Sequence, residues 1–490
     1  MQIKLDRHIS YTLQKQIYQQ VCEALFRGEL LYGDMLPSIR VLAGQLGIAR
    51  NTVTAVYEKL VHAGYVVNLP GIGFKVIFDA VIKTNNREQA STSLSMPPLP
   101  ILMQPSADVF VPEKDRLYFR LGEPDESAFP WSVWRKWNNT ASKKKHLMMT
   151  RYQDPQGLSC LRYEIARYLS HSRGIQTESE SIVIINGMQE GLSLLAQLFF
   201  SHSGEGSVVL ESPCYSGAWN LFQSAPNDRV SIPVDEQGIM TDKLPEKPTT
   251  LCYVTPSHQY PTGSLLSLAR REALLAWSRR VNSYIIEDDY DSAFLYGNQP
   301  LPALKSLDYA DNVIYLGSFS KTLGPGMRLG YMVCPQALLR PVVNMKALNN
   351  HGSSWLYQQF LAEYIHDQSY NYQLGRLEKE YALRRSELQS GLLELFPDGR
   401  ILNSQTGLHL SLDPHISPQC VEQLRARCLA AGVRFDTLKQ LGNGSELAYE
   451  KESGAVLMFF GFGGINRADI QRALVVLKRE LEQQQKLKMV

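Results

Sequence analysis

The amino-acid sequence predicts two folded units: a small N-terminal unit of short helices and a β-hairpin, and a larger α/β unit built on a mainly parallel sheet. Three observations support this prediction. The chain has 490 residues, of which 44% are hydrophobic, enough for two or three cores. Between about Asp79 and Leu117 the periodic apolar pattern gives way to prolines, serines and threonines. Beyond this stretch, short apolar runs alternate with helical patterns.

The N-terminal unit is expected to begin with two short helices. Apolar residues at helical spacing predict the first over roughly residues 11–27. The second is expected to open at Ser38, a residue type that caps helix N-termini, and to end at Gly47.

A third helix is expected to begin near Arg50 and to have one apolar and one polar face. The apolar positions at helical spacing are Val53, Val56, Tyr57, Leu60 and Val61. Nearer the opposite side are Arg50, Asn51, Thr54 and Lys59. Two β-rich runs around Pro70-Gly71-Ile72-Gly73 follow and predict a tight hairpin, in which the glycines serve the turn.

The larger unit contains five apolar runs that are typical of buried strands. They are SIVIIN, SVVLE, LCYVT, SYIIEDD and NVIYLGS, and a helical pattern over residues 187–200 follows the first. In parallel sheets, ligands bind at the carboxyl ends of the strands, so the residues after each run are the place to look for chemistry.

Charge and cysteine usage narrow the class of protein. Residues 1–77 carry eight Lys or Arg against five Asp or Glu, whereas the other 413 residues carry 42 against 43, which favours a nucleic-acid contact at the N-terminus. The seven cysteines lack the spacing of a zinc site or a disulfide framework. With no signal peptide and no run of about 20 apolar residues, we expect a cytoplasmic protein without metal or membrane contact.

The segment GDMLPSIRVLAGQLGIARNTVTAVYEKLVHAGYV carries LPS-x-R, LA-x-x-LG, R-x-TV and Y-x-x-L in order. It resembles the winged helix-turn-helix of GntR regulators, which implies that the third helix enters the major groove of a double-stranded DNA operator. The DNA-binding residues implied by the resemblance are Ser38, Arg40, Arg50, Asn51 and Thr52. Ala49 replaces the usual Ser before the recognition Arg, so a cap or phosphate contact is expected to be missing there. The alternative is that the arginines form ordinary solvated surface pairs.

Ser318-Phe319-Ser320-Lys321 follows an apolar run and precedes TLGPGMRLG. An isolated lysine in a loop is usually a solvated charge. Here the surroundings resemble the pyridoxal 5'-phosphate lysine of fold type I aminotransferases, in which burial lowers the pKa of the amine that forms the Schiff base. The resemblance makes Lys321 the cofactor lysine, and Ser318, Ser320 and Arg328 donors to the cofactor phosphate.

The acidic run IIEDDYD ends another strand, where a carboxylate can keep the pyridine nitrogen of the cofactor protonated. The resemblance gives this role to Asp288, with Asp289 as the alternative one residue along, and makes Tyr290 a donor to the phenolate oxygen. Without its neighbours, an acidic run after a strand is more often a metal site or a helix cap.

Three further segments resemble parts of the same family's cofactor site. NGMQEGL begins a helix, so Gly187, Met188 and Gln189 are candidates for binding the phosphate, although an ordinary strand-to-helix turn is the alternative. Tyr215, after Pro213-Cys214, is expected to stack on the pyridine ring unless it is simply a packing residue. TPSHQYPTG places His258 near the phenolate side.

The segment RYQDPQG resembles the one whose tyrosine reaches the phosphate of a neighbouring subunit. This resemblance implies a homodimer in which Tyr152 acts across the interface.

The chain departs from working aminotransferases where they clamp a substrate carboxylate with an arginine. Phe459 stands at that position, and Ser216, Gly217 and Ala218 follow Tyr215 without a basic group. An apolar pocket does not offset the desolvation of a free carboxylate. Three arginines remain as alternatives for reaching the pocket by another route: Arg400, Arg434 and Arg467.

The whole chain therefore resembles a MocR-type regulator, a GntR helix-turn-helix fused to a fold type I aminotransferase-like domain. The expected division is a DNA-binding domain over residues 1–78, a linker over 79–117 and an effector domain over 118–490. The resemblance and the missing clamp imply a regulator with little or no turnover that senses pyridoxal 5'-phosphate and controls vitamin B6 metabolism. The alternatives are a regulator that senses an amino compound through an external aldimine, and an active aminotransferase with an appended DNA-binding domain.

Overall fold

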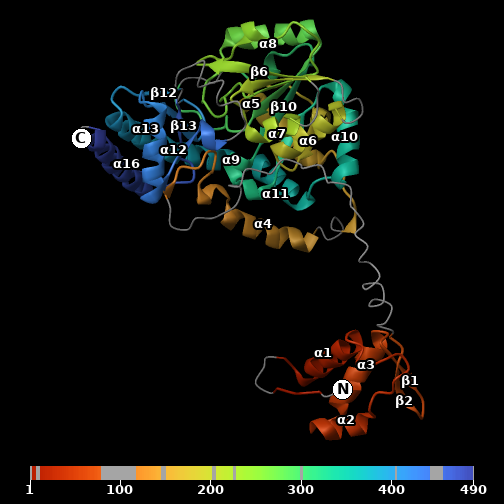
Figure 1. The fold of residues 1–490 in the computed structure, drawn as a ribbon. Helices are drawn as coiled ribbons and strands as arrows, with labels where there is room; N and C mark the ends of the chain where they lie inside the picture. Colours follow the sequence, from red (N-terminus) through yellow and green to blue (C-terminus); the bar gives the residue numbers. More distant parts are fainter. Residues whose placement is uncertain are drawn as a thin grey trace. The chain divides into compact units, whose positions relative to one another are not determined.

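The computed structural model describes residues 3–6, 11–78, 117–144, 150–200, 206–223, 228–297, 302–402, 405–441 and 456–488. The chain divides into two compact units, Met1–Leu102 and Met103–Val490 (Figure 1). The predicted linker lies outside the described residues except for Leu117, which the structure places in β3 (Leu117–Tyr118).

The N-terminal unit, called the head below, is a winged helix-turn-helix. Its elements are α1 (Leu13–Phe26), α2 (Ile39–Leu46), α3 (Arg50–His62), β1 (Val66–Leu69) and β2 (Gly73–Val76). The two strands form an antiparallel hairpin in which Leu69 lies opposite Gly73, and Gly71 and Gly73 both have positive φ. The three predicted helices and the predicted hairpin are therefore confirmed.

The apolar face of α3 forms the centre of the head core. Val53, Val56, Tyr57 and Leu60 are fully buried, as their spacing predicts. The assignment of Val61 to this face was wrong, because Val61 is 38% exposed. It follows Leu60 directly, and one residue turns a helix by about 100°, which carries the side chain off the buried stripe.

The caps of the head helices follow from their sequence. Ser38 caps α2, since its Oγ accepts a hydrogen bond from the Val41 amide at 3.3 Å, and Gly47 closes the helix in the left-handed conformation. In contrast, Ala49 is the N-cap of α3 and has no side chain to bind the first-turn amides. The absence of a cap at this position is confirmed.

The C-terminal unit, called the body below, is built on an eight-stranded sheet in the order β4-β11-β10-β9-β8-β5-β6-β7. The strands are β4 (Ile182–Ile185), β5 (Ser207–Ser212), β6 (Asp228–Asp235), β7 (Gly238–Ile239), β8 (Leu251–Val254), β9 (Tyr284–Asp289), β10 (Val313–Ser318) and β11 (Gly330–Val333). The pairs from β10 through β9, β8 and β5 to β6 are parallel, whereas β11 is antiparallel to both its neighbours. All five predicted strands lie in this sheet.

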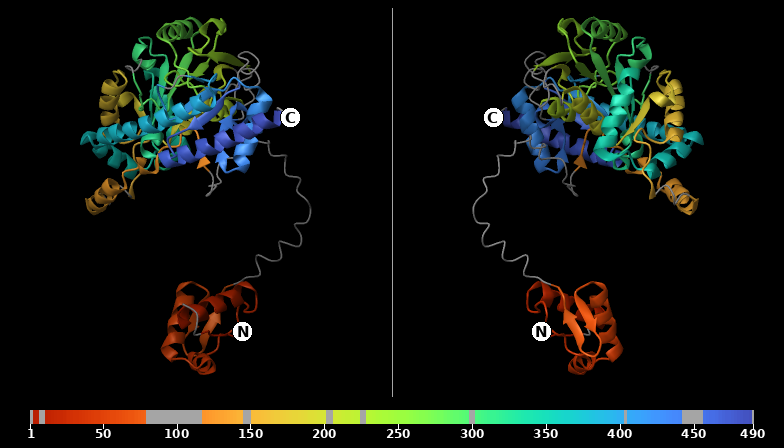
Figure 2. Two further views of the ribbon diagram at one scale, coloured as in Figure 1. Left: turned by 90° about the vertical axis from the view of Figure 1, so that its left-hand side faces the viewer. Right: turned by 90° about the vertical axis from the view of Figure 1, so that its right-hand side faces the viewer.

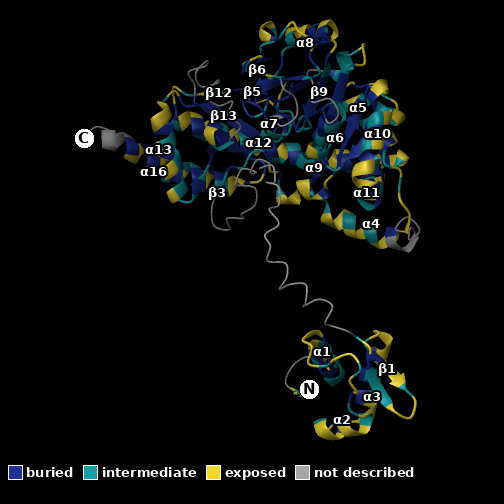
Figure 3. Cartoon of the chain, turned by 45° about the vertical axis from the view of Figure 1, so that its right-hand side comes forward, coloured by how far each residue is buried: buried dark blue, intermediate teal, exposed yellow. Residues whose placement is uncertain are grey.

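Helices cover both faces of the sheet (Figures 1 and 2). One face packs against α6 (Met188–Phe200), α7 (Ser216–Gln223) and α10 (Gln336–Asn350). The other packs against α5 (Ser159–Ser172), α8 (Leu268–Val281) and α11 (Trp355–His366). Alternate residues of β4 enter different cores, Val183 and Ile185 the first and Ile182 and Ile184 the second. Burial on both sides explains why the strands read as continuous apolar runs, and Figure 3 shows them as buried.

A second, antiparallel sheet lies towards the C-terminus in the order β12-β13-β16-β15. Its strands are β12 (Arg400–Leu402), β13 (His409–Asp413), β15 (Asp436–Thr437) and β16 (Met458–Gly461). Beside it are α12 (Ser369–Leu395), α13 (Pro418–Ala430), α14 (Leu438–Leu441) and α16 (Arg467–Lys488). The chain enters the body through β3, which pairs in parallel with β14 (Val433–Arg434).

The remaining helices are α4 (Trp131–Lys144), α9 (Ser320–Leu323) and the 3₁₀ turns Glu126–Ala128, Ser179–Ser181, Thr241–Lys243, Lys305–Leu307 and Pro325–Met327. Within the described parts of the chain, every helix is too short or too polar to cross a lipid bilayer.

Replacing Ala49 with Ser should supply the missing cap of α3. Since a capping hydroxyl satisfies a first-turn amide, Ala49→Ser is expected to raise the free energy of unfolding of the head by about 0.5–2 kcal/mol. The measurement is hydrogen exchange of the α3 peptides in the full chain, which should slow. Ala63→Ser, at the C-cap of the same helix, is the matched control. Unchanged exchange in Ala49→Ser would contradict the interpretation.

Candidate functional site

The ends of β9 and β10 bring the predicted cofactor lysine to a buried carboxyl group. Lys321 lies in α9, directly after β10, and its Nζ donates a hydrogen bond to the carbonyl oxygen of Gly122 at 2.7 Å. Desolvation lowers the pKa of the Lys321 amine, although Asp291, Asp288 and Glu123 act in the opposite direction. A lower pKa favours the neutral amine, which is the nucleophilic form.

Asp288 and Asp289 have different partners because consecutive residues of a strand point to opposite faces. The Asp288 Oδ2 accepts a hydrogen bond from Tyr253 at 2.8 Å, and its Oδ1 is buried without a hydrogen-bond partner. Asp289 forms a buried ion pair with Arg173 at 2.8 Å and accepts a short hydrogen bond from Tyr315. Asp288 is thus the one of the two that lies within electrostatic reach of Lys321.

Burial raises the pKa of Asp288 to about 7, even though the hydrogen bond from Tyr253 and the charge of Lys321 favour its ionised form. Asp289 and Asp291 add to the increase. A carboxyl group that is half protonated near neutral pH, with one unpartnered oxygen, is suited to a ligand that brings a hydrogen-bond donor or a positive charge.

Glu211 is a buried residue of the site that the sequence analysis missed. Its Oε2 accepts hydrogen bonds from the Thr255 amide and hydroxyl at 3.1 and 2.7 Å, and from Gln259 at 3.2 Å. Burial raises its pKa to about 7. Glu211 thus holds the loop that carries His258. The sequence signal for this role was an acidic residue at the end of an apolar strand, directly before Ser212-Pro213.

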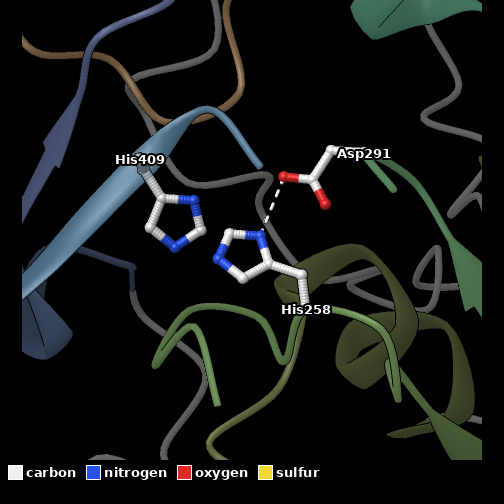
Figure 4. A group of neighbouring side chains, drawn as sticks. All are labelled: His258, Asp291 and His409. Atoms are coloured by element: carbon white, nitrogen blue, oxygen red, sulfur yellow. Dashed lines mark hydrogen bonds and ion pairs between the residues drawn. The ribbon is translucent and has the colours of Figure 1, made fainter. Parts of the chain in front are cut away.

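His258, Asp291 and His409 form a buried group at the junction of the two sheets (Figure 4). The Nδ1 of His258 lies 2.9 Å from Asp291 Oδ2 and 3.2 Å from the hydroxyl of Tyr290. His409, from β13, lies against His258 with ring centroids 4.5 Å apart, and its Nε2 contacts the carbonyl of Pro261 at 2.9 Å. Burial and His258 lower the pKa of His409 to about 3, so it is neutral. The structure thus places His258 and Tyr290 together, as predicted.

The predicted phosphate residues gather where β4 meets α6. Gly187 has a φ of +86°, and a Cβ there would lie 3.1 Å from Nη2 of Arg328. Arg328 Nη2 donates a hydrogen bond to the carbonyl of Asn186 at 2.7 Å. Met188 is the first residue of α6. Gln189 donates to the carbonyl of Gly217, in the first turn of α7, at 3.2 Å.

Two serines and Tyr215 were also predicted to contact the cofactor. The Oγ of Ser318 accepts a hydrogen bond from the Ser320 amide at 3.0 Å, which shapes the start of α9. Tyr215 is half-buried and lies edge to face with Tyr260, with ring centroids 5.8 Å apart. The charges of Asp288 and Arg328 both act on its hydroxyl, whose pKa burial raises.

Tyr152 lies outside this group. It is 88% exposed, and its ring packs beside His351 with centroids 5.2 Å apart.

The arginines considered as substitutes for a carboxylate clamp are paired with acidic residues. Arg434 lies 3.4 Å from Asp436, Arg467 lies 2.8 Å from Glu387, and Arg400 forms a short contact with Glu236. Phe459 is fully buried in β16, in an apolar cluster that includes Leu121.

The arrangement fits pyridoxal 5'-phosphate. The unpartnered Oδ1 of Asp288 suits a protonated pyridine nitrogen, and the amine of Lys321 suits the aldehyde. The turn at Gly187, the N-terminus of α6 and Arg328 together suit a phosphate dianion.

The predicted DNA-binding residues lie on the head. Arg40, Arg50 and Asn51 are exposed, and Thr52 is half-buried. Ser38 is exposed as well, but its hydroxyl already caps α2.

Two protein families match the chain. Residues 13–76 match bacterial regulatory proteins of the gntR family, and residues 121–432 match aminotransferases of class I and II. The chain belongs to the MocR type of bacterial transcription regulators, in which a GntR helix-turn-helix domain is fused to an aminotransferase-like domain.

Individual relatives cover most of the chain. "Probable rhizopine catabolism regulatory protein MocR" of Rhizobium meliloti is 33% identical over 78% of this chain and 77% of its own length. The "HTH-type pyridoxine biosynthesis transcriptional regulator PdxR" of Corynebacterium glutamicum is 32% identical over 84% and 85%. Among solved structures, LysN, an α-aminoadipate aminotransferase of Thermus thermophilus complexed with N-(5'-phosphopyridoxyl)-L-leucine, matches with a TM-score of 0.67 and 25% identity over 76% of this chain and 94% of that one.

The raised pKa of Asp288 predicts a pH dependence of stability in the cofactor-free protein. The folded value, about 7, lies above the unfolded value near 4, so this stabilising contribution is complete below pH 4 and is lost as the pH rises through 7. From pH 5 to 8, the wild-type body should lose on the order of 2 kcal/mol of unfolding free energy relative to Asp288→Asn.

The measurement is urea unfolding followed by tryptophan fluorescence, since all six tryptophans lie in the body. Glu211→Gln should show the same sign of difference. Parallel pH profiles of the wild type and Asp288→Asn would show that the pKa is not raised.

Proposed function

We propose that this regulator binds pyridoxal 5'-phosphate through Lys321, senses the cofactor itself and adjusts vitamin B6 metabolism. The observation that carries the proposal is that the Lys321 amine lies within electrostatic reach of a buried Asp288 that has an unpartnered oxygen. The apolar Phe459, where an arginine clamp was expected, favours the cofactor itself over an amino acid as the ligand that is sensed. The name of the PdxR relative supports vitamin B6 as the subject of regulation.

Each residue has a defined task in this proposal. Asp288 would hold a proton at the pyridine nitrogen, and Tyr290 would donate a hydrogen bond to the phenolate oxygen beside His258. The phosphate would be bound by the turn at residues 187–189 together with Ser318, Ser320 and Arg328. Tyr215 would pack on the ring. The cofactor supplies an aldehyde and an electron-withdrawing ring.

Little or no turnover is expected from this site. Transamination requires a correctly positioned substrate, which is usually held by an arginine that forms a bidentate interaction with its carboxylate. Phe459 cannot do this, and Arg400, Arg434 and Arg467 are engaged elsewhere. An amino-compound sensor or a working aminotransferase remains the alternative, and the discharge of the bound cofactor by an amino donor would favour it.

The head would bring this sensor to DNA. Ser38, Arg40, Arg50, Asn51 and Thr52 would contact a double-stranded operator, with the arginines at guanine edges or phosphates. We propose that residues 1–78 form the DNA-binding domain, 79–117 the linker and 118–490 the effector domain, in a cytoplasmic homodimer. Cofactor would change DNA affinity only through its different affinity for two arrangements of the protein.

Titration of the purified full chain with pyridoxal 5'-phosphate tests the proposal. A saturable absorbance band is expected in the wild type and not in Lys321→Ala, because only a primary amine condenses with the aldehyde. Operator binding at fixed salt should then differ with and without cofactor in the wild type alone. A band in both proteins, or DNA binding indifferent to the cofactor, would refute it.

Mixed dimers test the predicted role of Tyr152 across the interface. Tyr152→Phe and Lys321→Ala should each bind the cofactor weakly, since one lacks a phosphate contact and the other lacks the amine. In a mixed dimer, one pocket would combine an intact Lys321 with an intact Tyr152 and should regain wild-type affinity. Cofactor titration of the mixture checks this expectation, and the lack of any high-affinity sites in the mixture would rule the role out.

A further inference from the structure

Gly122 lies against the reactive amine of the proposed site. Its carbonyl oxygen accepts the hydrogen bond from Lys321 Nζ at 2.7 Å. Its φ is +65°, a conformation that favours glycine, and a Cβ there would lie 2.5 Å from Nζ. Any other residue would displace the Lys321 amine and strain the backbone, so the contact as it stands depends on the glycine.

Gly122 belongs to a segment, residues 117–125, that also forms hydrogen bonds with β14, β16 and α12. The amides of Leu117 and Phe119 donate hydrogen bonds to Gly432 and Arg434 at 2.8 and 3.0 Å. The Asp125 amide donates a hydrogen bond to the hydroxyl oxygen of Tyr381, in α12, at 2.8 Å. Lys321 joins the middle of this segment to the large sheet.

The same segment packs tightly on the end of β16. A Cβ on Gly461 would lie 1.9 Å from the carbonyl oxygen of Arg120, and one on Gly463 would lie 2.3 Å from that of Glu123. In the sequence, residues 117–125 directly follow the stretch that leads from the head. Loss of the hydrogen bond at Gly122 would therefore affect the residues that directly follow the predicted linker in the sequence.

Condensation of Lys321 with an aldehyde would remove the hydrogens that Nζ donates to the Gly122 carbonyl. A neutral lysine amine carries two hydrogens, one of which binds the Gly122 carbonyl. On condensation the Nζ forms a double bond to the aldehyde carbon, and the carbonyl oxygen leaves as water with both amine hydrogens. After both amine hydrogens have left, Nζ would donate to the Gly122 carbonyl only if it took up a further proton, and the phenolate oxygen of the ligand would compete for that proton. The Gly122 carbonyl loses its donor.

We propose that Gly122 is a specificity-determining residue: its contact with Lys321 is released by a phosphorylated pyridine that carries an aldehyde, and not by one that carries an amine or an alcohol at the same carbon. This inference rests on the proposed function. The protein thereby responds to covalent capture of the aldehyde rather than to filling of the pocket, and the response begins in residues 117–125.

Hydrogen exchange of the full chain, read by mass spectrometry on peptides that cover residues 117–125, tests the proposal. Pyridoxal 5'-phosphate should speed exchange there by about two- to tenfold, the ratio that one ordinary hydrogen bond supports. Pyridoxamine 5'-phosphate, at a concentration that fills the pocket by equilibrium dialysis, should leave exchange unchanged. A peptide from α8 is the internal control.

Two variants make the test independent of ligand affinity. Lys321→Met has no donor, so its segment should exchange fast with or without pyridoxal 5'-phosphate. Lys321→Arg keeps donors but does not condense, so its segment should stay slow in both conditions. Slow exchange in Lys321→Met, or equal acceleration by the amine and the aldehyde, overturns the inference. Unchanged exchange in a wild type that shows the absorbance band overturns this inference alone, whereas absence of the band overturns the proposed function as well.

Discussion

The alternation of side chains along β9 is the constraint on which the site depends. Three consecutive buried carboxyl groups end this strand, and each finds a different environment. Glu287 accepts the amides of Leu304 and Lys305 at 2.8 and 2.7 Å, Asp288 turns to Tyr253 and Lys321, and Asp289 turns to Arg173. Carboxylates that shared one environment would repel one another. A shift of one residue in the strand would turn Asp288 away from Lys321 and separate Asp289 from Arg173.

The loop that carries His258 links this strand to the smaller sheet. On the side of the large sheet, Glu211 accepts hydrogen bonds from Thr255 and Gln259 of the loop. On the side of the smaller sheet, His409 of β13 contacts the carbonyl of Pro261. Buried polar groups are stable only when they are paired. The loop therefore depends on both sheets, and a relative movement of the sheets would alter its hydrogen bonds.

Local patterns in the sequence were enough to predict the head and the five central strands, because burial on both faces leaves a continuous apolar run. The candidate residues at the ends of these strands were assigned by the resemblance of their motifs to those of fold type I aminotransferases, because an apolar run alone predicts only where a strand ends. The smaller sheet was not predicted, since its edge strands are short: β12 has three residues and β15 has two. Gly122 was missed because its contact joins residues 199 positions apart. The prediction for Val61 was wrong because it assigned two consecutive helical residues, Leu60 and Val61, to the same face.

The exposure of Tyr152 has a consequence for assembly. A side chain that is 88% exposed in one chain, yet needed by the pocket of another, would make each pocket complete only in the pair. Ligand binding and association would then be linked by mass action, because whatever binds the paired form preferentially also stabilises it. In that case vitamin supply would set how many pockets are filled and also the protein concentration at which the chains form dimers. The occupancy of an operator with two half-sites would then depend on both quantities.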